Sequence, residues 1–174
     1  NDVEAASAKD QPKTALKSLQ LIRNEALRSG NTAQLLRALF TEQVMQQEIA
    51  PDSGAVMREL IERELAKEKR PVERALWLNA LGRLYAERAR SSWRYNDTAA
   101  VLKAHDLLLE SVQQTALLGA ARTRDYATLF QFGADSKTTY NDDLLSVLTE
   151  TLVNAYEDNY FRLIKKEELQ EVLK

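Results

Sequence analysis

Apolar residues recur at intervals of three and four along most of this 174-residue chain, and this spacing constrains its fold more than any other feature. It is the period of an α-helix with one buried face, whereas a β-strand alternates apolar and polar residues. Few glycines (5) and prolines (3) interrupt it, and the apolar residues are rich in Leu and Ala, which favour helices. We therefore predict an all-α chain of six to seven helices. The periodic segments are 11–30, 31 to about 48, 56–65, 71–92, 97 to about 118 and 144–156.

Residues with special backbone chemistry mark the joints between these segments. Gly30 can adopt the left-handed conformation that ends a helix, and Asn31 can cap the next helix with Gln34 in the capping-box position. Near the other end of the chain, Asn141 to Asp143 can cap the last helix. The Gly30–Asn31 joint is therefore predicted to be a very short turn between two antiparallel helices.

The predicted helices fall into three pairs with a spacing of about 40 residues, the size of one unit in stacked helical-repeat folds. The pairs cover residues 11–48, 52–92 and 97–160, and the last contains an insertion at 119–140 without a clear period. Such an insertion is either a functional loop or holds a short helix. We predict one all-helical domain over residues 1–174, built of stacked antiparallel hairpins. A compact helical bundle is the alternative.

The apolar stripes also predict which side chains form the core. The residues expected to point inward include Leu19, Ala26, Leu27, Leu36, Val44, Val56, Ile61, Leu81, Leu84, Val101, Leu102, Leu108, Leu148, Leu152 and Val153.

The stretch "LNALGRLYAERARSSWRYND" at 78–97 partly fits the tetratricopeptide signature W-x2-L-G-x2-Y. Leu81, Gly82 and Tyr85 match, but Trp77 falls one residue early. The physical content of the match is Gly82, because a glycine within a helix lets a neighbouring helix approach closely. Its cost of about 1 kcal/mol relative to alanine is offset only if that contact exists.

Two clusters of aromatic and cationic residues are candidate partner-binding sites, because Trp, Tyr and Arg anchor many protein interfaces. They comprise Trp93, Arg94, Tyr95, Tyr126, Phe130 and Phe132. A structural role is favoured for both clusters. The first can cover a hairpin corner while Arg88, Arg90 and Arg94 meet the negative end of the helix dipole. The aromatic residues of the second can anchor the insertion.

Enzymatic chemistry has little support in the sequence. His105 is the single histidine, and it lies beside an apolar stripe, which favours a structural role. Without cysteine or a second histidine the chain offers no zinc site, and it has no phosphate-binding loop or hydrolase motif. A net charge of −2 argues against a nucleic-acid partner. We expect no enzyme activity, no cofactor and no metal.

Three segments resemble a known family. "QPKTAL" at 11–16, "GNTAQLLRAL" at 30–39 and "TTYNDDLLSVL" at 138–148 are similar to the helical N-terminal region of the large alpha-2-macroglobulin-like proteins of Bacteroidetes-type bacteria. The resemblance implies an exported protein in the periplasm or at the outer-membrane surface, often held by a lipid anchor outside this segment. Later domains of such proteins inhibit or trap proteases.

The segment itself lacks the inhibitory chemistry of that family, because a thioester requires cysteine and the chain has none. We therefore expect a non-enzymatic helical interaction or spacer module, the N-terminal part of a larger chain. Its partner would be a protein, a peptide or another domain of the same chain. The alternative is a freestanding tetratricopeptide-like adaptor that binds a peptide.

Overall fold

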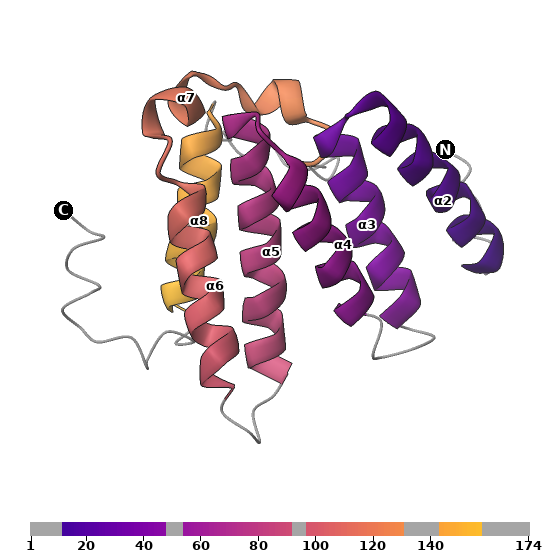
Figure 1. Cartoon of the computed structure of the whole chain (residues 1–174), viewed down its shortest axis with the longest axis horizontal. Coiled ribbons are helices and arrows are strands. Elements are labelled where there is room, and N and C mark those ends of the chain that lie inside the picture. The colour runs from indigo at the N-terminus through magenta and orange to yellow at the C-terminus, as the bar shows by residue number, and fades with distance from the viewer. Residues whose placement is uncertain (1–11, 48–53, 92–96, 131–142, 158–174) are drawn as a thin grey trace, which may run out of the picture. The chain divides into compact units, whose positions relative to one another are not determined.

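The computed structural model describes residues 12–47, 54–91, 97–130 and 143–157, and these residues are almost entirely helical (Figure 1). The prediction of an all-α chain is confirmed, since the described residues form seven α-helices and a short 3-10 helix. The elements are α2 (Pro12–Ser29), α3 (Thr32–Gln47), α4 (Gly54–Lys67), α5 (Pro71–Ser91), α6 (Thr98–Ser111), α7 (Thr115–Ala120), η2 (Thr123–Tyr126) and α8 (Leu144–Glu157).

The chain forms two compact units. Unit 1 comprises Asn1–Leu60 and Thr123–Thr139, and unit 2 comprises Ile61–Arg122 and Tyr140–Lys174. Unit 2 is therefore interrupted in sequence by a segment of unit 1, and the predicted 119–140 insertion divides between the two.

Unit 1 is built on the antiparallel pair of α2 and α3, whose joint has the predicted chemistry. Gly30 has a φ of +67°, and the Asn31 amide donates to the Ala26 carbonyl at 3.0 Å. The Asn31 Oδ1 atom accepts a hydrogen bond from the Gln34 amide at 3.0 Å and so caps α3. Ala15 and Leu19 form a small core with the partly buried Ile22 and Met45. The tight turn thus holds the two helices together at one end.

An ion pair links the same two helices. The Arg23 guanidinium on α2 lies 2.8 Å from a carboxylate oxygen of Glu42 on α3, whose side chain is only 9% exposed. Gln46 donates a further hydrogen bond to the Glu42 carboxylate at 3.2 Å. The Glu42 carboxylate is therefore satisfied by two donors where it is screened from water.

In unit 2, α5 packs most extensively against α6. Arg74 pairs with Glu110, Gly82 faces Ala104 and Leu108, and Arg88 pairs with Asp97. These partners draw closer in sequence toward the α5–α6 connection, as expected for antiparallel helices. The most extensive helix packing thus joins α5, in the predicted hairpin 52–92, to α6, in the predicted hairpin 97–160. The boundaries of the predicted hairpins stay a prediction.

The helix predicted to run from 97 to about 118 ends earlier, at Ser111. The Val112 amide bonds back to the carbonyls of Leu109 and Glu110, and α7 begins three residues further on. No glycine or proline lies between 98 and 118 to signal this break. It turns the chain toward α8, where the Leu144 amide donates to the Ala121 carbonyl at 3.0 Å.

Most of the predicted core is buried, including Leu36, Ile61, Leu81, Leu108 and Leu148, but several predicted core residues are exposed. A helical stripe has two flanks, and packing decides which of them is covered. On α6, for example, Ala104 and Leu107 are buried and Leu102 is 44% exposed. The exposed residues that contradict the prediction are Leu27, Val44, Val56, Leu102 and Val153.

Candidate functional site

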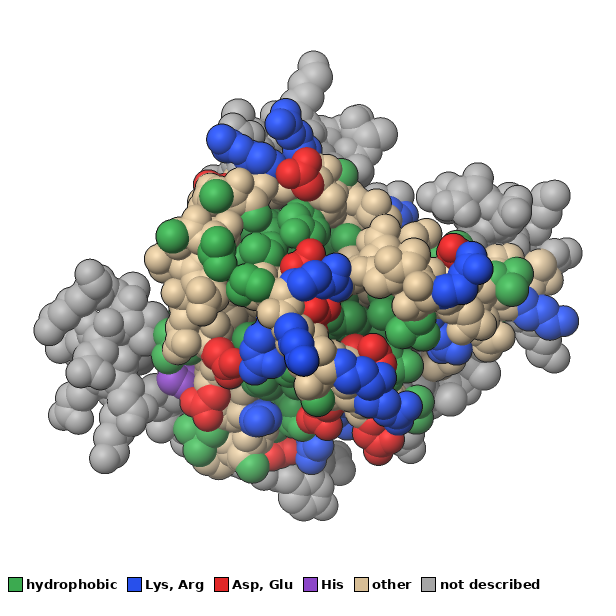
Figure 2. Space-filling model, turned by 45° about the horizontal axis from the view of Figure 1, so that its top comes forward, with side chains coloured by type: hydrophobic (Ala, Val, Ile, Leu, Met, Phe, Trp, Pro, Cys, Tyr) green, Lys and Arg blue, Asp and Glu red, His purple; other side chains and the backbone are tan. Residues whose placement is uncertain are grey.

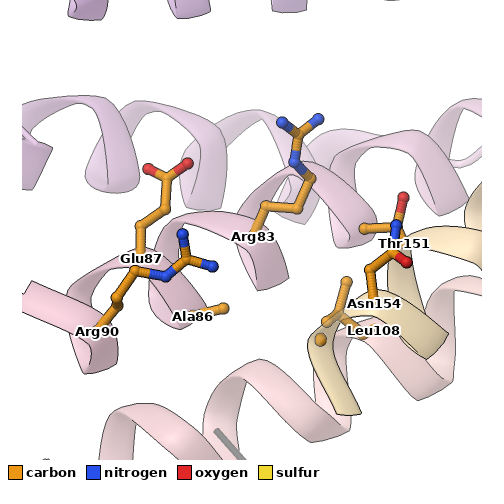
Figure 3. Close-up of a pocket in the computed structure, with 8 residues that line it drawn as sticks. Arg83, Ala86, Glu87, Arg90, Leu108, Thr151 and Asn154 are labelled. Carbon is orange, nitrogen blue, oxygen red and sulfur yellow. The ribbon is translucent and has the colours of Figure 1, made fainter. Parts of the chain in front are cut away.

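Three helices of unit 2 enclose a surface groove of about 240 Å³ (Figure 3). The second half of α5 forms one wall, α8 forms the other, and one residue of α6 reaches it from below. The lining residues are Arg83, Ala86, Glu87, Arg90, Leu108, Thr151, Asn154 and Ala155.

The α5 wall follows from helical spacing. Arg83, Glu87 and Arg90 are separated by four and three residues, so they project from one face of the helix. Arg83 and Arg90 lie seven residues apart, which is roughly 10.5 Å along the helix axis. Ala86 lies between them and leaves room in the groove because its side chain is a single methyl group. The wall therefore has long charged side chains around a small apolar centre.

Gly82 places Leu108 at the base of the groove. A Cβ atom at residue 82 would lie 2.7 Å from Leu108 Cγ and 3.3 Å from the Ala104 carbonyl oxygen, so α5 and α6 approach closely because this position has no side chain. The predicted close approach at Gly82 is confirmed. Leu108 is 1% exposed and belongs to a core with Val101, Ala104 and Leu152. The groove thus lies directly over well-packed side chains.

The α8 wall combines polar and small residues. Asn154 is exposed, and Ala155 packs against the core beneath. The Thr151 hydroxyl donates to the Val147 carbonyl at 3.2 Å. The helix is held at its start by Asp143, whose Oδ1 accepts from the Ser146 amide at 2.8 Å, as predicted for residues 141–143. Of these two polar side chains, the Asn154 amide is open to solvent, whereas the Thr151 hydroxyl is hydrogen-bonded to the backbone of its own helix.

Charged side chains occur on the α5 wall of the groove. Among the described residues its lining includes two guanidinium groups, those of Arg83 and Arg90, and the carboxylate of Glu87. On the face drawn in Figure 2, basic and acidic side chains of the described residues are interspersed.

The groove is small, and its described lining offers few reactive groups. A volume of about 240 Å³ lies below the roughly 300 to 1,000 Å³ of pockets for cofactors and drug-sized ligands. The lining holds neither a histidine nor a cysteine, and the Thr151 hydroxyl is already bonded to backbone. Within the described ranges, no group of three or more His, Cys, Asp or Glu side chains could hold a metal ion.

His105 lies outside the groove lining, on α6. It is 8% exposed, its Nδ1 atom lies 3.3 Å from Asp106 Oδ1, and its ring meets Tyr156 of α8 edge to face with centroids 5.9 Å apart. These contacts are those of a side chain that joins two packed helices.

The structure does not bring the predicted partner-binding residues together in one described site. Tyr126 and Phe130 are half-buried in unit 1, where Arg37 of α3 donates to the Thr128 carbonyl at 3.1 Å and holds the segment. The other four, Trp93, Arg94, Tyr95 and Phe132, lie outside the described residues. Their binding role stays a prediction.

The groove was not predicted from the sequence. Arg88 and Arg90 lie in the last turn of α5, where they were expected to meet the helix dipole. Arg90 also lines the groove, and Arg88 pairs with the Asp97 carboxylate at 2.9 Å. The available signal was the pair of arginines seven residues apart around Ala86. This spacing alone does not indicate a groove, because the second wall is formed by α8, about 65 residues later in the sequence.

Comparison of the chain with protein-family models, curated proteins and solved structures gives no match. Among the helices of the described residues, none has both the length and the apolar character to cross a membrane.

Proposed function

We propose that this chain is a non-enzymatic helical interaction module that binds a protein segment in the groove between α5 and α8. The observation that carries the proposal is the groove itself, with Arg83 and Arg90 around an apolar base in a rigid helical frame. Arginine beside a small apolar surface is a frequent composition of protein interfaces. The partner is a separate protein, a peptide or another domain of the same chain.

The size of the groove supports a peptide segment as its occupant. A space of about 240 Å³ accommodates a few side chains, whereas most cofactors need more room. Side chains of a partner segment can enter such a groove while its backbone stays near the rim.

The wider context is proposed from the sequence resemblance alone. In that proposal the module belongs to an exported bacterial alpha-2-macroglobulin-like protein of the periplasm or outer-membrane surface, whose inhibitory domains lie elsewhere. Fractionation of the native host cells with an antibody against this chain tests it. Recovery in the cytosol would contradict the proposed location.

A tetratricopeptide-like peptide adaptor is the second candidate, and Gly82 favours it. The residue fits the glycine of the signature, and it lies at a close contact between the antiparallel helices α5 and α6. In this case the chain would act alone as a peptide receptor. A full-length native protein with additional inhibitory domains would exclude it.

A steric block tests the binding function. Peptides selected from a random display library against the purified chain would be measured by fluorescence anisotropy against Asn154→Trp, which fills the groove from an exposed position. Affinity should fall at least about tenfold. Glu150→Trp, an exposed α8 residue outside the lining, is the matched control and should bind normally. Failure to select any peptide, or equal binding to both variants, would contradict the proposal.

A further inference from the structure

We propose that the second half of α8, residues 151–157, is an arm that opens away from α5 and α6 while the first turn of the helix stays in place. The movement lies within unit 2 and needs no ligand, so it goes beyond the proposed binding function. Three observations support it. The two ends of α8 are held differently, the groove lies beside the second half only, and an amide without a hydrogen-bond acceptor is buried next to the groove.

The start of α8 is fixed to the segment that follows α7. The Leu144 amide donates to the Ala121 carbonyl at 3.0 Å, and Arg122 and Asp143 form an antiparallel bridge. The Leu144 side chain is completely buried. Backbone hydrogen bonds between two separate segments are lost only if the segments part, and water then has to satisfy both partners. The first turn of α8 is therefore the fixed end of the arm.

The second half of α8 is held by side-chain packing. Leu152 is 3% exposed and belongs to the same core as Leu108 of α6. The Tyr156 ring meets the His105 ring of α6 edge to face, with centroids 5.9 Å apart. Contacts of this kind weaken steeply with small displacements, because dispersion attraction falls off within about 1 Å of the optimal separation. We call the contact between Tyr156 and His105 the latch of the arm.

The groove separates the second half of α8 from α5. The residues that α8 contributes to its lining are Thr151, Asn154 and Ala155, all of them in the arm (Figure 3). A space of about 240 Å³ therefore lies between the two helices at this level. The side chains of Leu144 and Leu148, in the first half, are instead buried. Opening of the arm would widen the groove and expose its apolar base.

A buried amide next to the groove favours this opening. Asn79 precedes Arg83 by one helical turn and lies on the same face of α5 as Ala86 and Arg90, which line the groove. Asn79 is 6% exposed, and its Nδ2 atom makes no hydrogen bond to the residues that the structure describes. A buried donor without an acceptor destabilises the packed state. Water that enters when the arm opens relieves part of this cost.

Single cysteines test the opening, since the chain has no cysteine of its own. Leu152→Cys and Leu144→Cys each place one thiol on the buried stripe of α8, in the arm and at its fixed end. Dithiobis(nitrobenzoate) reacts with such a thiol only when it reaches solvent. Relative to the same variant unfolded in urea, Leu152→Cys should react at least about tenfold faster than Leu144→Cys. Leu81→Cys on α5 reports general unfolding and should react no faster than Leu144→Cys.

The latch is tested by substitutions of Tyr156 in both α8 cysteine variants. Tyr156→Ala should speed the reaction of Leu152→Cys at least about threefold, which corresponds to the loss of one aromatic pair. The reaction of Leu144→Cys should not change. Tyr156→Phe is the matched control, because it keeps the ring, and it should leave both rates unchanged. Equal acceleration at the two cysteines would show general destabilisation and would contradict the proposed arm.

The role of the buried amide is tested with Asn79→Leu, which replaces it by an apolar side chain of similar size. The reaction of Leu152→Cys should slow by about threefold, because the packed state no longer holds a donor without an acceptor. The ratio of its rate to that of Leu144→Cys should fall accordingly. An unchanged ratio would overturn the role given to Asn79.

Equal rates for Leu152→Cys and Leu144→Cys would overturn the inference, because α8 would then open only as a whole. Circular dichroism would verify that each variant is folded. If Leu152→Cys does not fold, Leu108→Cys replaces it, and Leu107→Cys, a buried α6 position outside that core cluster, is its control. Faster reaction of Leu108→Cys would support the arm, and equal rates would exclude it.

Failure of the arm and failure of the binding function are distinguishable, because the cysteine experiment uses no ligand. If no peptide can be selected but Leu152→Cys reacts faster than Leu144→Cys, the binding function is wrong and the arm is supported. If a peptide binds and Asn154→Trp weakens it while the two cysteines react equally, the groove is a binding site and the arm is excluded.

Discussion

Gly82 shows how one absent side chain sets the geometry of unit 2. The backbone of α5 lies so close to α6 that a methyl group at this position would overlap Leu108, which is fully buried. Leu108 in turn forms both the core and the base of the groove. The lower helix propensity of glycine is therefore offset by a close helix contact.

Gly82→Ala is expected to destabilise the fold, although alanine is the better helix former. Overpacking against Leu108 and the Ala104 carbonyl should cost more than the roughly 1 kcal/mol gained in propensity, for a net loss of about 1 to 2 kcal/mol. Urea denaturation followed by circular dichroism measures the change.

Gly119→Ala is the matched control, because nothing lies within 4 Å of a Cβ atom at this helical position. It should stabilise the protein by up to about 1 kcal/mol. Equal effects of the two substitutions would show that helix propensity alone determines the outcome.

Arg70 keeps Glu68 ionised to a lower pH than an unpaired glutamate. The Arg70 side chain donates to the Glu68 carboxylate at 2.9 and 2.7 Å, and its backbone amide donates at 3.0 Å. These hydrogen bonds lower the pKa of Glu68 from 4.5 to about 2. They lie in the connection between α4 and α5.

Acid should therefore weaken the protein partly through this group. Because the folded-state pKa is depressed, the stabilisation is complete above about pH 4.5 and is lost as the pH falls toward 2. The Arg70 side chain is half exposed, so solvent screening reduces the contribution to about 1 kcal/mol. Unfolding free energies of the wild type and Glu68→Gln should differ by this amount at pH 6 and converge near pH 2.

Arg70→Gln should reduce the pH dependence of the unfolding free energy between pH 6 and pH 2 as Glu68→Gln does. The double variant should behave nearly like either single variant, because both remove the interaction between Glu68 and Arg70. Additive effects would show that a group other than Arg70 lowers the pKa of Glu68.

At the scale of elements, local hydrogen bonds mark where three of the described helices begin. Asn31, Asp97 and Asp143 each accept a bond from the amide three residues later, and so cap α3, α6 and α8. Asp97 also pairs with Arg88 near the end of α5. One carboxylate thus caps a helix and links it to the preceding one.

Asp97→Ala should cost about 1 to 2 kcal/mol, since it removes both the cap and the ion pair. Asp97→Asn keeps a capping oxygen, and Arg88→Gln removes only the ion pair, so each should cost less than about 0.5 kcal/mol. Thermal denaturation of the three variants separates the two contributions. A loss in Arg88→Gln as large as that in Asp97→Ala would assign the stability to the ion pair.

At the scale of the whole molecule, the chain is divided into two compact units that are interleaved in sequence. Each has its own packed side chains, with Ala15 and Leu19 in unit 1 and Val101, Ala104, Leu108 and Leu152 in unit 2. Separate cores favour separate local unfolding.

Native-state hydrogen exchange should therefore resolve two groups of amides. Glu42→Ala removes the carboxylate that pairs with Arg23, and it should lower the opening free energy of α2 and α3 by about 1 to 3 kcal/mol while α5 and α6 change little. Gly82→Ala should instead lower the opening free energy of α5 and α6 while α2 and α3 change little. Equal loss of protection in all four helices would indicate one cooperative unit.

Sequence alone determined the helical nature of the chain and several of its turns and helix caps. The Gly30 turn, the Asn31 cap and the Asp143 cap all depend on bonds within a few residues, so local sequence is sufficient to predict them. The same logic identified Gly82 as a site of close approach, although it could not name Leu108 as the contact.

Tertiary structure decided the rest. The end of α6 at Ser111 and the exposure of Val44, Val56 and Leu102 had no local signal, because they depend on which flank of a helix a distant segment covers. The groove joins residues from Arg83 to Ala155, and no spacing rule connects positions so far apart. Hydrogen bonds and capping act over one helical turn, whereas a binding surface exists only after separate helices have packed together.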